Sequence, residues 1–170
     1  DGDMDVLSAS INDDKIAWYR NDGNGGFGAQ LVISSSANFA TSVYAADLDG
    51  DGDMDVLSAS GNDNKIAWYK NDGNGGFGVQ NVISNLAVPD THGAISVYAA
   101  DLDRDGDMDV LSASVNDDKI AWYRNDGNGG FGAQNVISTA ADGAQAVYAA
   151  DLDGDGYIDV LSASINDNKI

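Results

Sequence analysis

Four stretches of the chain are rich in regularly spaced aspartate residues. The stretch from Asp47 to Asp55 reads DLDGDGDMD and places carboxylates at its positions 1, 3, 5, 7 and 9, with glycine at position 6. Similar stretches occupy 101–109 and 151–159, and the chain opens at 1–5 on the end of another. Alternate residues of a short loop can point oxygens inward, and glycine permits the sharp turn, so the pattern is typical of a calcium-binding loop.

Comparison of the copies assigns an expected role to each loop position. Calcium takes about six to eight oxygen ligands, which we expect from the carboxylates at positions 1, 3, 5 and 9, a backbone carbonyl at position 7 and water. Position 7 is Asp53, Asp107 or Tyr157, so its carbonyl rather than its side chain is the expected ligand. The copy at the start of the chain lacks the first two ligands. The candidate metal-site residues are Asp47, Asp49, Asp51, Asp53 and Asp55; Asp101, Asp103, Asp105, Asp107 and Asp109; Asp151, Asp153, Asp155, Tyr157 and Asp159; and Asp1, Asp3 and Asp5.

Positions 6 and 4 of the loop bear on its backbone conformation. Position 6 is glycine in every copy, as a turn with positive φ requires. Position 4 is Gly50, Arg104 or Gly154, and the arginine predicts that positive φ is not required there. The alternative to a metal site is a set of acidic hairpin turns that only keep the surface soluble. Without a cation, however, several carboxylates so close together would repel one another strongly.

Short strands must position these loops. Alternating patterns predict strands at 42–47, 55–60, 65–70 and 79–84, and no window sustains a helical stripe. The Asn-Asp pair within 61–64 predicts a tight hairpin. The repeat recurs after roughly fifty residues, a period that together with four short antiparallel strands indicates one blade of a β-propeller. We therefore expect an all-β fold built of propeller-type blades of four antiparallel strands.

The repeat divides the chain into four parts. We expect a partial blade without its inner strand at 1–46, blade repeats at 47–100 and 101–150, and a partial blade holding only inner strands at 151–170. Closed propellers typically have about four to eight blades, so we expect an incomplete ring or part of a longer array. Unpaired strand edges would then join further copies of the repeat, in the same long chain or by self-association, and contacts that do not close would give a filament.

Composition excludes several classes of function. The 28 acidic residues are all aspartate and face eight Lys and Arg, for a formal net charge of −20. This charge repels nucleic acid and anionic membrane surfaces, and no run is apolar enough to span a bilayer, so we expect neither nucleic acid binding nor membrane insertion. With one His, no Cys and no Glu, the usual pairs of nucleophile and base are hardly available. We therefore predict that the protein is not an enzyme.

These motifs carry a family resemblance. The stretch SVYAADLDGDGDMDVLSAS, followed by KIAWYKNDGNGGFG, resembles the FG-GAP or VCBS-type repeat of bacterial surface proteins, which is related to the calcium-bearing blades of integrin α-subunit propellers. The resemblance covers essentially the whole chain. It implies calcium in the loop after the innermost strand, with VYAAD as the inner strand, DVLSAS second, KIAWYK third and VQNVIS outermost. It does not specify the role, because such repeats occur in adhesins, lectins and domains attached to enzymes.

The segment NDGNGGFG recurs at 21–28, 71–78 and 125–132. We interpret it as a hairpin turn, because Asp-Gly and Asn-Gly tolerate positive φ. Its phenylalanine is then expected to pack under the turn, at Phe27, Phe77 and Phe131. The alternative, a glycine-rich calcium-binding roll, would repeat after about nine residues.

Tryptophan occurs once per repeat, at Trp18, Trp68 and Trp122. Each shares a strand face with an isoleucine two residues earlier, so we expect it to pack between neighbouring blades. The alternative is that these rings are stacking platforms for sugars. One irregular connection, at 85–95, holds the only Pro and the only His and is a candidate for a specific contact, with an inert surface insertion as the alternative.

Two functions of different classes remain. The first is a calcium-binding extracellular structural or adhesive module, in a large surface protein or a filament, and the near-identity of the copies favours it. The second is a lectin-like carbohydrate-binding propeller, whose partners would be glycans. Calcium modules that need roughly 0.1–1 mM ion would stand empty in the cytosol, and the resembling family is one of exported proteins. We therefore expect secretion or display at the cell surface, where surface proteins are further candidate partners.

Overall fold

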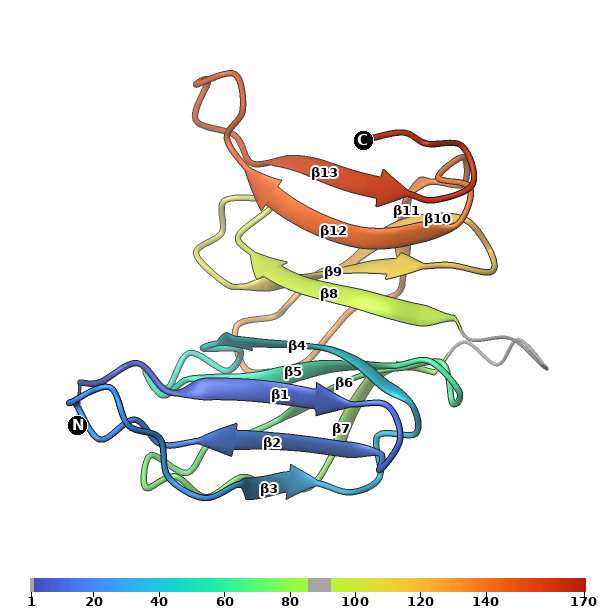
Figure 1. The fold of residues 1–170 in the computed structure, drawn as a ribbon. Coiled ribbons are helices and arrows are strands. Elements are labelled where there is room, and N and C mark those ends of the chain that lie inside the picture. The colour runs from blue at the N-terminus through green and yellow to red at the C-terminus, as the bar shows by residue number, and fades with distance from the viewer. Residues whose placement is uncertain (1, 86–92) are drawn as a thin grey trace.

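The chain folds into antiparallel β-sheets. The computed structural model describes residues 2–85 and 93–170, and its regular elements are the strands β1 to β13. They form four sheets that follow one another along the chain (Figure 1). Within the described ranges, no helix is long and apolar enough to cross a membrane. The prediction of an all-β fold is confirmed.

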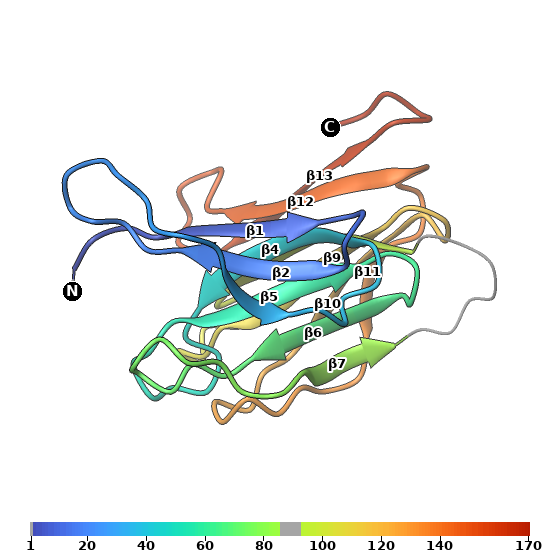
Figure 2. The same cartoon turned by 60° about the horizontal axis from the view of Figure 1, so that its bottom comes forward.

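Two sheets have four strands in chain order, and the flanking sheets have three and two. Figure 2 shows β4 to β7 in this order. The first sheet contains β1 (Val6–Ser10), β2 (Lys15–Tyr19) and β3 (Leu31–Ser34). The second contains β4 (Ala40–Ala46), β5 (Asp55–Ser60), β6 (Lys65–Tyr69) and β7 (Asn81–Asn85). The third contains β8 (Ala94–Ala100), β9 (Asp109–Ser114), β10 (Lys119–Tyr123) and β11 (Asn135–Ser138), and the fourth contains β12 (Ala144–Ala150) and β13 (Asp159–Ser164).

The order of the strands confirms what the family resemblance implies. In the second sheet, β4 pairs with β5, β5 with β6 and β6 with β7, all antiparallel. The second strand, β5, is buried along its whole length, because neighbouring sheets cover both of its faces. The inner strand begins at Ala40 and the outer strand at Asn81, close to the predicted bounds. The second, third and fourth sheets thus take their inner strands from the residues just before an Asp loop.

The sheets stack face to face with their inner strands β4, β8 and β12 side by side (Figure 1). Tyr44, Tyr98 and Tyr148 on these strands form a ladder of tilted rings. The ring centroids are 4.5 Å apart in the first pair and 4.6 Å apart in the second. The described sheets do not close into a ring, so they form an incomplete propeller.

Tryptophan packs between neighbouring sheets, as the strand pattern predicts. The Trp18 ring lies edge-on to Phe77 of the next sheet, with centroids 6.3 Å apart. Trp68 is buried in a core cluster that includes Tyr123 of the next sheet. A Cβ on Gly129 would lie only 2.5 Å from the Trp68 ring. The turn of one sheet therefore needs glycine where the tryptophan of the preceding sheet approaches it.

The phenylalanines of the later turns also reach the preceding sheet, a contact that the prediction of packing under the turn did not include. Phe77 contacts the Trp18 ring of the preceding sheet, and Phe131 packs against the core cluster that contains Trp68. Phe27, in the first sheet, is 52% exposed. The ring belongs to an interface between sheets, which a pattern within one repeat does not reveal.

The segment NDGNGGFG forms a closed turn, as predicted. In the copy at 71–78, the Asp72 amide donates to the Gly76 carbonyl at 2.9 Å, and the Asp72 carboxylate accepts from the amides of Asn74 and Gly76. These two backbone hydrogen bonds hold the pKa of Asp72 below its usual range. Of the irregular connection at 85–95, residues 86–92 lie outside the described residues.

Candidate metal centre

Each Asp loop connects the inner strand of a sheet to its second strand. Asp47 follows β4 directly, and Asp55 opens β5 opposite Ala46, the last residue of β4. The strand pair therefore holds positions 1 and 9 of the loop beside each other, and the residues between them form a tight turn.

The structure brings three carboxylates of each complete loop together. In every case they stand at positions 1, 3 and 9, and one oxygen from each lies within 4.8 Å of the others. The groups are Asp47, Asp49 and Asp55; Asp101, Asp103 and Asp109; and Asp151, Asp153 and Asp159. Three like charges at this separation repel one another, so the arrangement favours a bound cation.

The carboxylate at position 9 also holds the loop in place. Asp55 is fully buried and accepts from the Leu48 amide at 2.9 Å and from the Asn71 amide at 2.8 Å. Asp109 is placed in the same way in the third sheet. Burial raises the pKa of both carboxyls, and the backbone hydrogen bonds oppose that rise. Position 9 thus ties the start of its loop to the end of the third strand.

Positions 1 and 5 shape the turn through hydrogen bonds to backbone amides. The Asp47 carboxylate accepts from Gly50 at 2.8 Å and from Gly52 at 3.0 Å. Asp51 Oδ1 accepts from the Asp53 amide at 3.0 Å, which leaves Oδ2 for another partner. Among the described residues, position 5 stands outside each group of three gathered carboxylates.

A positive φ at position 4 contradicts the expectation from sequence. The angles are 73° at Gly50, 67° at Arg104 and 78° at Gly154. Arginine therefore adopts a left-handed conformation that disfavours residues with a Cβ. Its guanidinium lies 4.7 Å from the centroid of the Tyr157 ring in the next loop, and this cation–π contact offsets part of the strain. Position 6 has positive φ in all three complete loops, as predicted.

The side chain at position 7 points away from the gathered carboxylates. A Cβ on Gly73 would lie 2.5 Å from Asp53 Oδ2, and one on Gly127 would lie 2.5 Å from Asp107 Oδ2. These carboxylates therefore rest against the NDGNGG turn of their own sheet. Tyr157, the residue at this position in the last loop, lies under Arg104. This placement leaves the backbone carbonyl as the ligand that position 7 could offer.

Two oxygens of the gathered carboxylates have no partner in the part of the chain that the structure describes. Asp49 Oδ1 and Asp101 Oδ1 are buried and accept no hydrogen bond there. An unsatisfied buried carboxylate oxygen is unfavourable, and a cation in the loop would satisfy it. The donors are all oxygen, which suits calcium or magnesium rather than a metal that prefers nitrogen or sulfur. The residues present therefore fit a calcium ion.

The copy at the start of the chain is less complete. Asp1 lies outside the described residues. Asp5 Oδ1 accepts from the Asn21 amide at 2.8 Å, the same role that position 9 has elsewhere. Asp3 lies against the turn of its own sheet, since a Cβ on Gly23 would stand 2.9 Å from its Oδ2.

A basic side chain at the end of each third strand was missed by the sequence analysis. Lys70 Nζ contacts Asp49 Oδ2 and lies 3.0 Å from Asp51 Oδ2. Arg124 lies 2.7 Å from Asp103 and 2.9 Å from Asp105. The signal was available, because Lys or Arg follows KIAWY in every copy where the chain continues.

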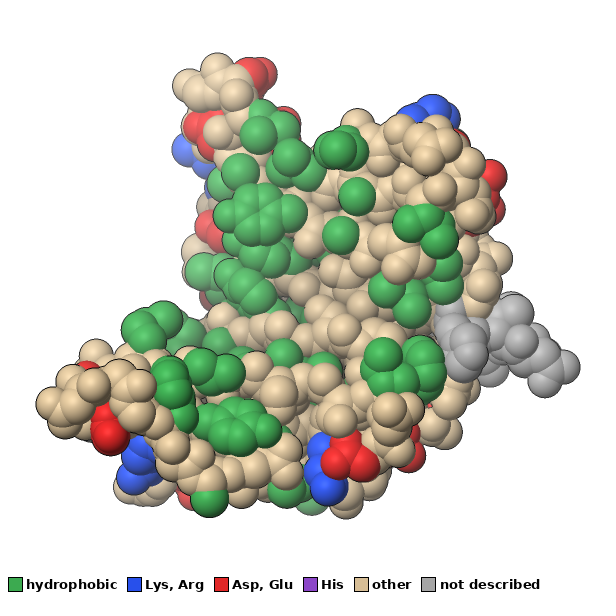
Figure 3. Space-filling view, viewed as in Figure 1, with side chains coloured by type: hydrophobic (Ala, Val, Ile, Leu, Met, Phe, Trp, Pro, Cys, Tyr) green, Lys and Arg blue, Asp and Glu red, His purple; other side chains and the backbone are tan. Residues whose placement is uncertain are grey.

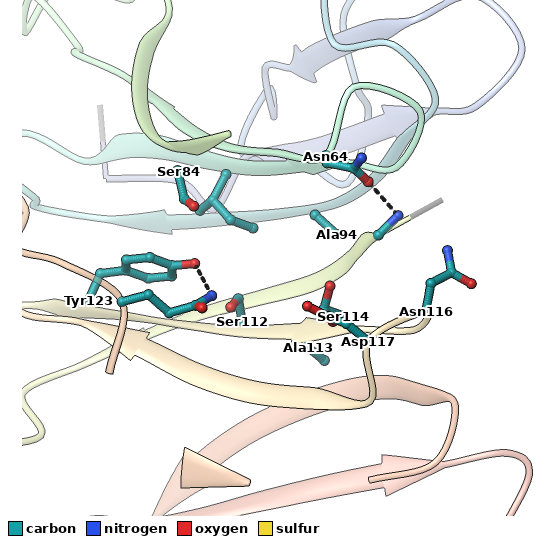
Figure 4. A pocket seen from close by; sticks show the side chains of 12 residues that line it. Asn64, Ser84, Ala94, Ser112, Ala113, Ser114, Asn116, Asp117 and Tyr123 are labelled. Atoms are coloured by element: carbon teal, nitrogen blue, oxygen red, sulfur yellow. Dashed lines mark hydrogen bonds between the residues drawn. The ribbon is translucent and has the colours of Figure 1, made fainter. Parts of the chain in front are cut away.

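Two hollows bear on the carbohydrate alternative. A cavity of about 20 Å³ lies between the second and third sheets. Figure 4 shows residues that line it, among them Asn64, Ser112 and Asp117. It has room for about one water molecule and none for a sugar. A groove of about 840 Å³ runs over the inner strands, with Tyr98, Met54 and Met108 in its lining. Figure 3 shows hydrophobic side chains gathered on this side of the upper sheets. The groove is within the size range of ligand pockets.

Comparison with a solved structure supports the fold. One match, with a TM-score of 0.62 and 22% sequence identity, covers 88% of this chain and 41% of the other. Its title describes specific recognition of non-reducing terminal N-acetylglucosamine by an Agrocybe aegerita lectin. The present chain thus spans well under half of that lectin's length, and at this identity the likeness concerns the fold alone. No curated protein matches the chain.

The family comparison covers nearly the whole chain. The FG-GAP-like repeat matches three times, at residues 1–58, 47–112 and 108–162. These matches contain the three complete Asp loops and the strands on either side of them. The chain therefore belongs to the FG-GAP-like repeat family.

Proposed function

We propose that the chain is a calcium-binding module of an extracellular structural or adhesive protein, and that it acts by binding rather than by catalysis. The observation that carries the proposal is the pair of buried, unpartnered oxygens, Asp49 Oδ1 and Asp101 Oδ1, within the gathered carboxylates. Membership of a repeat family whose relatives hold calcium in this loop supports it.

The residues that would hold calcium follow the loop positions. In the second sheet, Asp47, Asp49 and Asp55 already bring one oxygen each close together. Asp51 and the carbonyl of Asp53 would complete the set. Calcium would supply the positive charge that neutralises these carboxylates. The same positions serve in the loops 101–109 and 151–159.

Bound calcium is expected to stabilise the fold, because the folded loop binds the ion better than the unfolded chain does. The test is the melting temperature in calcium and in chelator. Calcium should raise it, and Asp51→Ala should reduce the rise. Asp63→Ala is the matched control, since Asp63 lies in the hairpin at the other end of the sheet and pairs with Lys65. An equal melting temperature in calcium and chelator would sink the proposal.

An extracellular location is part of this proposal. Extracellular calcium is about millimolar, which suits modules of modest affinity. Further copies of the repeat, or other surface proteins, are the proposed partners. Cell fractionation of the source organism with an antibody to the chain tests the location, and recovery only from the cytosol would contradict it.

A lectin-like function is the second candidate. The groove over the inner strands and the lectin among the structures with this fold favour it. Trp68 is buried between sheets and is not available for sugar stacking, so the rings to test are those that line the groove, Tyr44 and Tyr98. A glycan array should show binding that Tyr98→Ala weakens. Absence of binding to any glycan would refute the lectin-like function and leave the structural or adhesive module as the remaining proposal.

A further inference from the structure

Two sheets place a basic side chain on the same two loop positions. In the second sheet, Lys70 Nζ contacts the Oδ2 atoms of Asp49 and Asp51. In the third sheet, Arg124 Nε lies 2.7 Å from Asp103 Oδ2, and Arg124 Nη2 lies 2.9 Å from Asp105 Oδ2. A lysine and an arginine, which differ in shape, thus reach positions 3 and 5 of their own loops. The shared property is positive charge.

The basic group contacts carboxylates that a metal ion would also bind. Position 3 belongs to each group of gathered carboxylates. At position 5, Oδ1 already accepts a backbone hydrogen bond in both loops, from Asp53 in one and from Asp107 in the other. Lys70 and Arg124 contact the other oxygen of this carboxylate, Oδ2, which a metal ion could also bind. The basic side chain and a metal ion would therefore compete for this Oδ2 atom.

Packing does not account for a basic residue at this place. The side chains of Lys70 and Arg124 are 49% and 57% exposed, whereas Asp49 beneath Lys70 is 8% exposed. The position thus delivers a fixed charge to the loop from a side chain that is otherwise in solvent.

We propose that Lys70 and Arg124 are built-in counter-ions that take the place of calcium in the metal-free loop. Each relieves the repulsion among its carboxylates and keeps the metal-free sheet folded. Each must also release the position 5 carboxylate when calcium enters, so it weakens calcium binding. The second half of this inference rests on the proposed function, that the loops bind calcium.

Lys70→Met tests the inference, in a chain whose other loops are disabled by Asp103→Ala and Asp153→Ala. Isothermal titration calorimetry should show calcium binding to the remaining loop tighter by about three- to tenfold, which corresponds to the loss of one or two partly exposed ion pairs. In chelator, Lys70→Met should lower the melting temperature. In saturating calcium, Lys70→Met should lower the melting temperature less. The melting temperatures in calcium and in chelator should therefore differ more for Lys70→Met than for the parent.

Two controls separate competition from a change in net charge. Lys65→Met removes the same charge, but Lys65 pairs with Asp63 in the hairpin at the far end of β6, so calcium affinity should change little. Lys70→Arg should behave as the parent does, because Arg124 makes the equivalent contacts in the third sheet.

The outcomes distinguish this inference from the proposed function. If the parent binds calcium and Lys70→Met binds it no more tightly, or if Lys65→Met gives the same gain, the competition is refuted while the calcium site stands. If neither parent nor variant binds calcium, the proposed function and the competition fail together. An unchanged melting temperature of Lys70→Met in chelator overturns the counter-ion role in either case.

Discussion

Asn125 of the third sheet donates a hydrogen bond from its side-chain amide to the carbonyl of Leu48, in the Asp loop of the second sheet, at 2.8 Å. The same amide donates to Met108 in its own loop, and the Asn125 backbone amide donates to Asp109. Leu48 in turn donates its amide to Asp55. One buried asparagine therefore links two neighbouring Asp loops through their position 9 carboxylates.

Asn125→Ala should lower the free energy of unfolding by about 1–3 kcal/mol, because it leaves buried carbonyls without their donor. Asn71→Ala is the matched control. Asn71 is the equivalent residue of the second sheet, and its amide donates to Met54 in its own loop. Urea denaturation of both variants in chelator measures the difference. Equal losses would show that the link between the loops contributes nothing.

Gly129→Ala should be more destabilising than the same change at the equivalent position of the first turn. Both glycines have positive φ, 76° at Gly129 and 87° at Gly25, so alanine costs about 1–2 kcal/mol at either. At Gly129 the added Cβ would also meet the Trp68 ring at 2.5 Å, whereas at Gly25 it meets nothing within 4 Å. We expect a further loss of about 1–3 kcal/mol at Gly129. Thermal or urea unfolding checks this, and equal effects would contradict the packing of tryptophan between sheets.

Arg104 and Tyr157 should be energetically coupled. Arginine at a position with φ of 67° is strained, and its contact with the ring lies between two successive loops. A double-mutant cycle of Arg104→Gly and Tyr157→Ala should give a coupling of about 0.5–1 kcal/mol. Arg104→Gly should be better tolerated in the Tyr157→Ala background, because the strain is then removed with no ring contact to lose. Additive effects would show that the contact is not stabilising.

Acid stability should depend on the turn carboxylate Asp72. The amides of Asn74 and Gly76 hold the pKa of Asp72 below its usual value of 3.8. The ionised form therefore contributes stability above pH about 3.8, and this contribution is lost as the pH falls through the lower folded pKa. Asp72→Asn keeps an acceptor for both amides but cannot titrate. The difference in urea midpoint between parent and variant, measured in chelator, should shrink between pH 5 and pH 2, and a constant difference would contradict the assignment.

Much of the fold could be predicted from sequence, because the signals for strands and turns lie within one repeat. The alternation in DVLSAS and KIAWY and the Asn-Gly turns act over a few residues, and the strand order followed from the family resemblance. The side of the sheet that Trp68 covers was also predictable, since its face is shared with Ile66.

Features that depend on how one sheet meets the next were not predictable from the pattern within a repeat. Phe77 packs on Trp18 of the preceding sheet. Arg104 tolerates positive φ beside Tyr157, a residue of the following repeat. Within one sheet, Lys70 reaches Asp49 because the end of the third strand passes over the Asp loop. The recurring Lys or Arg after KIAWY marks the position in the sequence but does not identify its partner. In each case, the contact joins residues that no local period relates.

Calcium binding by the Asp loops can be measured by isothermal titration calorimetry of the metal-stripped chain. We expect three ions per chain, one in each of the loops 47–55, 101–109 and 151–159. We expect two ions after Asp51→Ala, while Asp63→Ala, in a hairpin remote from the loops, should leave the number at three. Absence of calcium binding at millimolar concentration, or a stoichiometry that Asp51→Ala does not change, would show that the loops are not calcium sites.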